Sequence, residues 1–182
     1  WPGESFYNAR LSGIVDECLG NGIARVSEGA VCVFPDESGK PEQDPFKVKN
    51  DAGWADFPMI IRKSDGGFNY ATTDIATLEY RRDQWNADSV WYVVDHRQSL
   101  HFQQLFAVAK RLGCGSMDLR HISFGTILGK DGKPLKTRSG DLPQLADLLD
   151  EAVAAAAVVG AERSRVDTQE EKDALAELSG IS

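Results

Sequence analysis

The order strand, helix, strand between residues 89 and 128 constrains the fold more than any other feature of this chain. The run Ser89–Val94 is continuously apolar after its first residue and ends at Asp95, which is typical of a buried strand in a parallel sheet. A helical pattern extends from Ser99 to Leu112, and a second strand-like run occupies His121–Leu128. Two strands joined through a helix favour a right-handed crossover, so the sequence predicts an α/β fold with a parallel sheet and flanking helices.

Two polar segments follow these strands directly. Residues 95–98 follow the first strand, and residues 129–140 follow the second. Ligands of open α/β sheets bind outside the carboxyl ends of the strands. The sequence therefore predicts that both segments border a binding site.

The N-terminal part is expected to hold a helix, a strand and an insertion. Apolar residues recur at helical spacing over residues 4–20, and the β-rich run Ala30–Phe34 stops at Pro35. The stretch from about 36 to 56 is polar and rich in Lys, Asp, Gly and Pro, which predicts an insertion loop.

A hairpin and another helix are expected next. The runs 57–62 and 68–72 flank the turn sequence Ser64–Gly67 and predict a β-hairpin. Thr72 or Thr73 then caps a helix that runs to about Trp85. Further along, residues 143–182 predict a helical segment with a break that begins at Gly160 and a capped second helix.

Composition limits the class of protein. The chain has 182 residues, enough for one domain, and a formal net charge of −8 with a pI near 4.9. This charge argues against a main nucleic-acid surface, which needs clustered Lys and Arg. The three cysteines form no C-x-x-C pair, so neither a zinc site nor a disulfide framework is indicated. With no membrane span or signal-peptide pattern, we expect a cytoplasmic protein with reduced thiols.

A basic, glycine-rich loop stands out in this acidic chain. It spans Gly125–Gly140 and includes Lys130, Lys133, Lys136 and Arg138. Glycines let the backbone approach a ligand, and lysine ammonium groups together with the Thr137 hydroxyl suit phosphate oxygens. The loop is therefore interpreted as a polyphosphate clamp, with a solvated hairpin as the alternative.

Three motifs in order resemble the catalytic domain of the arginyl-tRNA synthetases, a family of class I aminoacyl-tRNA synthetases. They are Asn69–Asp83, Ser89–Gln104 and the lysine loop, and the resemblance runs from Gly3 to Ala152. It implies that residues 1–142 are the second half of a Rossmann-type catalytic domain, with a KMSKS-like loop at 129–140. Residues 143–182 would lead toward an anticodon-binding domain missing here. The family's H-I-G-H motif is absent from these residues, and the chain does not begin with methionine, so we expect a partial domain that is inactive alone.

The resemblance implies an arginine pocket. The family's Y-x-x-x-D pattern stands here as Tyr70–Asp74, with Tyr70 expected at the end of a strand. A carboxylate such as that of Asp74 matches the planar guanidinium with two charge-assisted bonds, and Gln98 is assigned to the same substrate. The alternative for Asp74 is a carboxylate that only stabilises a helix N-terminus. The alternative for Gln98 is a loop glutamine.

The resemblance also implies an ATP site in which Lys133 and Lys136 are catalytic. These lysines, with Thr137 and Arg138, would neutralise charge on the phosphates during adenylate formation. Aligning K-P-L-K-T with K-M-S-K-S puts Lys136 on the second lysine, whereas aligning L-K-T-R-S-G with M-S-T-R-K-G puts it on serine. Nucleotide contacts are assigned to His101 and Gln104, with a structural or solvent role as the equally weighted alternative.

The function implied is ligation of L-arginine to tRNA(Arg) through an arginyl-adenylate, with ATP and Mg²⁺ as the substrate complex and activation dependent on tRNA. Most tRNA contacts are expected outside this chain, and no protein-bound metal is expected. One alternative is a synthetase for another amino acid, which the buried carboxylate of Asp74 argues against. Another is a non-catalytic synthetase-like paralogue or interaction module.

Overall fold

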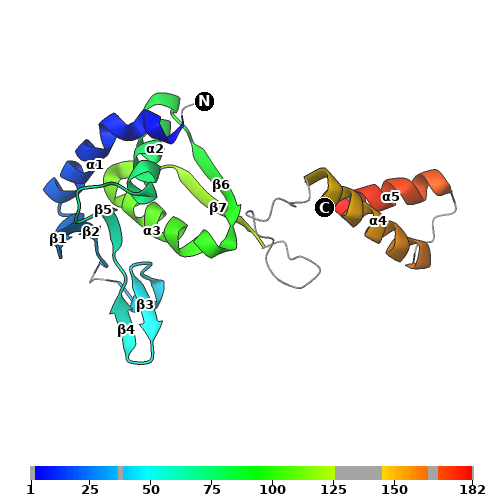
Figure 1. Cartoon of the computed structure of the whole chain (residues 1–182), viewed down its shortest axis with the longest axis horizontal. Coiled ribbons are helices and arrows are strands. Elements are labelled where there is room, and N and C mark those ends of the chain that lie inside the picture. Colours follow the sequence, from blue (N-terminus) through cyan, green and yellow to red (C-terminus); the bar gives the residue numbers. More distant parts are fainter. Residues whose placement is uncertain (1–2, 37–38, 126–144, 164–167, 182) are drawn as a thin grey trace. The chain divides into compact units, whose positions relative to one another are not determined.

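The computed structural model describes residues 3–36, 39–125, 145–163 and 168–181 (Figure 1). The chain divides into two compact units, Trp1–Thr126 and Ile127–Ser182. The first unit contains all strands of the described residues, and the second contains a pair of helices.

The predicted strand, helix and strand are confirmed in the first unit. Strands β6 (Ser89–Asp95) and β7 (Asp118–Phe124) pair in parallel. Their register runs without a break from Ser89 opposite Asp118 to Asp95 opposite Phe124. The short 3-10 helix η3 (His96–Gln98) and helix α3 (Ser99–Ala109) follow β6, and a π-helical turn, η4 (Lys110–Cys114), follows α3. Strand β7 begins three positions earlier than expected, and the end expected for it, Leu128, lies outside the described residues.

Only one face of the β6–β7 pair is covered within the first unit. Val90 is buried, and Tyr92 packs against Phe102 of α3 with ring centroids 4.8 Å apart. The opposite face is exposed and carries the apolar side chains Trp91, Val93, Ile122 and Phe124, with the Arg120 guanidinium over the Trp91 ring. The continuous apolar run of β6 thus arises because both faces of the strand carry apolar side chains, although only one face is buried.

A second, antiparallel sheet corrects the hairpin expected at 57–72. Strands β1 (Ala24–Ser27), β2 (Ala30–Val33) and β5 (Met59–Arg62) pair in the order β1–β2–β5. The turn after β5 is present, with Lys63 N–H donating to the Gly67 carbonyl oxygen at 2.8 Å. The chain does not return as a strand, because helix α2 (Tyr70–Trp85) begins there instead.

Asn69 caps helix α2, so the expected cap at Thr72 or Thr73 is wrong. The Asn69 side-chain oxygen accepts from the Ala71 N–H at 3.1 Å, and its Nδ2 donates to the Ile60 carbonyl at 2.9 Å. The hydroxyl of Thr72, which is fully buried, donates to the Ile61 carbonyl. Both side chains therefore tie the start of α2 to β5, which leaves Thr72 inside the helix.

The stretch expected to be an insertion loop carries regular structure. It contains the 3-10 helix η2 (Pro41–Gln43) and a hairpin of β3 (Lys47–Asn50) and β4 (Gly53–Asp56), which projects from the unit (Figure 1). At the base of the hairpin Phe46 is fully buried, and the Arg111 guanidinium lies 4.9 Å from its ring centroid. The hairpin strands are largely polar, which explains why the sequence indicated a loop.

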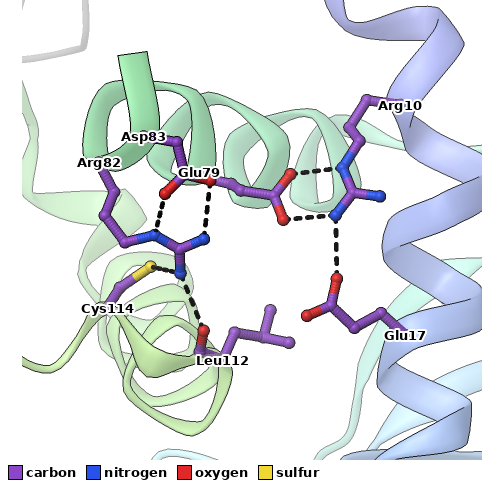
Figure 2. Close-up of polar contacts among 7 residues, drawn as sticks. All are labelled: Arg10, Glu17, Glu79, Arg82, Asp83, Leu112 and Cys114. Carbon is purple, nitrogen blue, oxygen red and sulfur yellow. Dashed lines mark hydrogen bonds and ion pairs between the residues drawn. The ribbon is translucent and has the colours of Figure 1, made fainter. Parts of the chain in front are cut away.

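Helix α1 (Asn8–Gly20), preceded by the 3-10 helix η1 (Glu4–Tyr7), confirms the N-terminal helix. Arg10 of α1 forms a two-bond contact with Glu79 of α2 and a bond to Glu17 (Figure 2). The Arg10 side chain is 44% exposed, so the pair contributes at most about 1 kcal/mol. Burial of the apolar face of α1 contributes more to stability than this ion pair does. The buried side chains of that face are Leu11, Ile14, Val15 and Cys18.

Arg82 joins the C-terminal part of α2 to the turn after α3. Its Nη1 donates to the Leu112 carbonyl at 3.0 Å and lies 3.3 Å from the Cys114 sulfur, while Asp83 accepts from the rest of the guanidinium (Figure 2). All three cysteines are buried and free, and burial raises the pKa of Cys18 to about 11. The thiols therefore pack as small apolar groups.

The second unit consists of helices α4 (Leu145–Arg163) and α5 (Gln169–Ile181). The first helix, expected to end at about Val159, continues through Gly160 to Arg163, and the second begins at Gln169 within the range expected for its start. The capped start of α5 is confirmed, since the Thr168 hydroxyl donates to Glu171 at 2.7 Å and accepts from the Glu171 N–H at 3.4 Å. Among the described residues, no helix combines the length and apolar character that crossing a membrane requires.

Candidate functional site

A cleft of about 870 Å³ opens in the first unit where the start of α2 and the start of α3 meet β6. All five residues singled out from the sequence within the described ranges contribute to its lining: Tyr70, Asp74, Gln98, His101 and Gln104. We call this space the α2–α3 cleft. It lies beside η3, which directly follows β6, as predicted for a ligand site of an α/β sheet.

The turn after β6 is shaped by Asp95. Its Oδ1 accepts from the Arg97 N–H at 2.8 Å, and the Arg97 guanidinium donates to both carboxylate oxygens at 2.9 and 3.0 Å. These bonds from Arg97 hold the pKa of Asp95 at about 2. The carboxylate therefore remains charged at neutral pH and caps the N-terminus of η3. The last residue of η3, the exposed Gln98, lies at the edge of the cleft.

Tyr70 and Asp74 lie on one face of α2, four residues apart. Tyr70 is the first residue of the helix and is 63% exposed, so its expected position at the end of a strand is wrong. Asp74 follows as the fifth residue of α2, beyond a first turn that holds no acidic residue, so the helix dipole favours its charge only weakly. The alternative role of a helix-terminal carboxylate therefore gains little support from this position.

His101 of α3 reaches across to Asp74. Its Nε2 lies 2.7 Å from Asp74 Oδ2, and the two side chains are 10% and 32% exposed respectively. The His101 ring also makes an edge contact with Tyr70, with centroids 4.7 Å apart. Three cleft residues from two helices therefore form one contact group.

Gln104 lies one turn further along α3 and is only 5% exposed. Its Nε2 donates to the carbonyl oxygens of Pro45 at 3.1 Å and Phe57 at 2.8 Å. These two residues flank the β3–β4 hairpin, so one side chain ties both ends of the hairpin to α3. Because both amide hydrogens are used, a nucleotide contact through them would require this tie to break.

We expect Gln104→Met to lower the free energy of unfolding of the first unit by about 1–3 kcal/mol, because it leaves two carbonyls without a donor at nearly constant side-chain volume. Urea unfolding followed by tryptophan fluorescence measures this unit alone, since all four tryptophans lie within residues 1–126. The matched control is Gln103→Met on the exposed side of the same helix. Equal midpoints for the two variants would contradict the tie.

Sequence reasoning missed Tyr92. Its hydroxyl is buried at the cleft, and burial raises its pKa, an effect that the nearby Arg81 side chain partly offsets. The Arg81 guanidinium lies over the ring, 5.4 Å from its centroid. The signal that could have found it is the alternation of side chains along β6. Tyr92 and Val94 lie on the same face of the strand as the buried Val90, whereas the sequence showed only a uniform apolar run.

The phosphate-binding residues expected in the lysine loop, Lys133, Lys136, Thr137 and Arg138, lie outside the described residues. Within the described ranges, no group of three or more His, Cys, Asp or Glu side chains is arranged to hold a metal ion. The α2–α3 cleft is therefore the site on which the chemistry can be argued from geometry.

Comparison with known proteins gives consistent similarities. The profile described as tRNA synthetases class I (R), catalytic domain, matches residues 2–182. An arginine–tRNA ligase of Frankia casuarinae is 45% identical over 181 residues, which are 98% of this chain and 29% of that protein. An arginine–tRNA ligase of Rhodopirellula baltica is also 45% identical, over 98% of this chain and 25% of its own length. The chain thus spans less than a third of these relatives.

Solved structures resemble the fold. The arginyl-tRNA synthetase of Plasmodium falciparum superposes with a TM-score of 0.58 at 26% identity, covering 97% of this chain and 27% of that one. A putative arginyl-tRNA synthetase of Campylobacter jejuni gives a TM-score of 0.53 at 18% identity, over 90% of this chain and 33% of its own, and supports the fold alone.

Proposed function

The chain belongs to the catalytic-domain family of the class I arginyl-tRNA synthetases, and from this premise we propose that it serves an enzyme that ligates L-arginine to tRNA(Arg) through an arginyl-adenylate made from ATP. The chain supplies the part of the active site that selects arginine, together with the KMSKS-like loop at 129–140. The full-length enzyme, meaning a complete synthetase that contains this chain, carries out the reaction.

The observation that carries this proposal is the carboxylate of Asp74 in the α2–α3 cleft, with Tyr70 and Gln98 on the same lining. A guanidinium presents five donors in one plane, and a carboxylate accepts two of them side by side. The exposed ring of Tyr70 can lie against the guanidinium face, and the Gln98 amide can donate or accept at the amino-acid end. A neutral amino acid would offer the Asp74 carboxylate no cationic group, which disfavours synthetases for such substrates.

ATP is proposed to bind with Mg²⁺ as a substrate complex, with its phosphates held by Lys133, Lys136, Thr137 and Arg138. The arginine carboxylate attacks the α-phosphorus and pyrophosphate leaves, so catalysis consists of positioning and charge neutralisation. Residues 143–182 are proposed to lead toward an anticodon-binding domain, and most tRNA contacts are placed outside this chain. An acidic chain of net charge −8 is a poor nucleic-acid surface.

The test is ATP–pyrophosphate exchange by the full-length enzyme with tRNA supplied. Arginine should support exchange, whereas citrulline, which has nearly the same shape but no charge, should not. Asp74 gives the physical reason, because an uncharged ureido group gains no ion pair from it. Equal exchange with citrulline, or none with arginine, would overturn the proposal.

The 182-residue chain by itself should not catalyse arginine-dependent exchange, even with tRNA present. The family's H-I-G-H motif, which grips ATP from the other half of the site, does not occur in its sequence. The same assay measures this, with the full-length enzyme as the positive control. Exchange above the no-enzyme background would show that the chain holds a complete site.

A further inference from the structure

We propose that His101 is a positioning residue that sets the orientation of the Asp74 carboxylate toward the guanidinium of the substrate. The inference rests on the proposed function and assigns to His101 a role different from the nucleotide contact that the sequence suggested.

The contact between the two side chains is the first argument. His101 Nε2 lies 2.7 Å from Asp74 Oδ2, and the residues come from different helices, 27 positions apart in the chain. No other hydrogen bond to the Asp74 side chain is found in the part of the chain that the structure describes. A carboxylate on a helix can rotate about its side-chain bonds, so this single bond is what fixes its plane.

The His101 ring is itself held in place. Tyr70 meets it edge-on at 4.7 Å and 68° between ring planes, and Phe102 meets it at 5.2 Å and 61°. The side chain of His101 is only 10% exposed, whereas that of Asp74 is 32% exposed. The histidine is therefore the fixed partner and the carboxylate the group that it orients.

The chemistry of the bond fits this role. A neutral imidazole with its proton on Nε2 donates to Asp74 Oδ2 and leaves the negative charge on the carboxylate. Oδ1 and the remaining lone pair of Oδ2 stay available for the two parallel bonds that a guanidinium offers. With the proton on Nε2, the remaining ring nitrogen Nδ1 has no hydrogen to donate to a phosphate oxygen. This argues against a direct phosphate contact.

Two substitutions separate the bond from the packing. His101→Phe keeps an aromatic ring between Tyr70 and Phe102 but removes the donor, whereas His101→Gln replaces the donor at similar reach. In the full-length enzyme, His101→Phe should raise the KM for arginine about tenfold or more, the scale of a lost bond to a charged group. The KM for ATP and kcat should stay within about twofold, and His101→Gln should recover most of the loss.

The matched control is His96→Phe, because His96 lies five residues earlier with a side chain 57% exposed and no part in the cleft lining. This control should leave both KM values unchanged. A double-mutant cycle completes the design: in an Asp74→Asn background, His101→Phe should change the arginine KM less than about twofold, since its effect passes through Asp74.

Three outcomes would overturn the proposal. A rise in the KM for ATP instead of arginine would return His101 to nucleotide binding. Additive effects in the cycle would show that His101 acts independently of Asp74, and equal losses of activity and thermal stability in both His101 variants would assign it to packing. The parental enzyme reports separately on the proposed function, because its arginine-dependent exchange does not depend on any of these comparisons.

Discussion

Asp74→Asn in the full-length enzyme is expected to raise the KM for arginine by roughly 30- to 4,000-fold, which corresponds to the 2–5 kcal/mol lost when one partner of a desolvated charge pair is removed. Asparagine keeps the shape of the side chain but removes the charge and one of the two acceptor oxygens. The KM for ATP should change less than about threefold, because the nucleotide is proposed to be held elsewhere. Steady-state exchange kinetics with each substrate varied in turn measure both values.

Asp83→Asn is the matched control for this variant. Asp83 lies on the same helix but pairs with Arg82 and does not contribute to the cleft lining. It should leave the arginine KM as it is in the parental enzyme. Unchanged arginine kinetics in Asp74→Asn would instead return Asp74 to the role of a carboxylate that only complements the helix dipole.

Lys136→Ala is expected to slow adenylate formation by about 10²- to 10³-fold, the scale observed when one group that stabilises transition-state charge is removed. Arginine affinity should stay nearly unchanged, because the lysine acts on charge that develops on the phosphates during the reaction. Rapid-quench measurement of the first turnover reports this rate directly.

Lys133→Ala, measured in the same way, decides the register of the loop. If Lys136 stands at the second lysine of the K-M-S-K-S pattern, Lys136→Ala should slow adenylate formation more than if Lys136 stands at the serine position. First-turnover rates equal to the parental rate in both single variants and in the double variant would contradict the phosphate clamp, and the loop would then be a solvated hairpin.

Some of the architecture could be predicted because local sequence and tertiary packing agree there. The β6–α3–β7 order followed from long apolar patterns, whereas the position of Tyr70 on the same helix as Asp74 did not, because Tyr70 was expected at the end of a strand. The position of Gln98 at the cleft followed from the rule that ligands bind at the carboxyl ends of parallel strands, whereas Tyr70 and Asp74 were expected there from the family resemblance.

Other features could not be predicted because they depend on contacts distant in sequence. At the start of α2, the Asn69 side chain also donates to the Ile60 carbonyl, a contact that the local sequence does not reveal. Strand β5 pairs with β2, whose residues lie about 30 positions earlier, rather than with the chain after its own turn. Likewise, the tie of Gln104 to Pro45 and Phe57 links segments 47 to 59 positions apart.

That tie has a consequence for how this part of the chain can change. Because one amide pins both ends of the β3–β4 hairpin, we expect displacements at its tip, Asp51–Ala52, to leave the cleft unchanged. Both tip residues are exposed, and exposed hairpin tips are where insertions are tolerated best. Evolution could therefore lengthen or shorten the hairpin without altering amino-acid selection, and a protein engineer could graft a tag or a reporter domain at the same place.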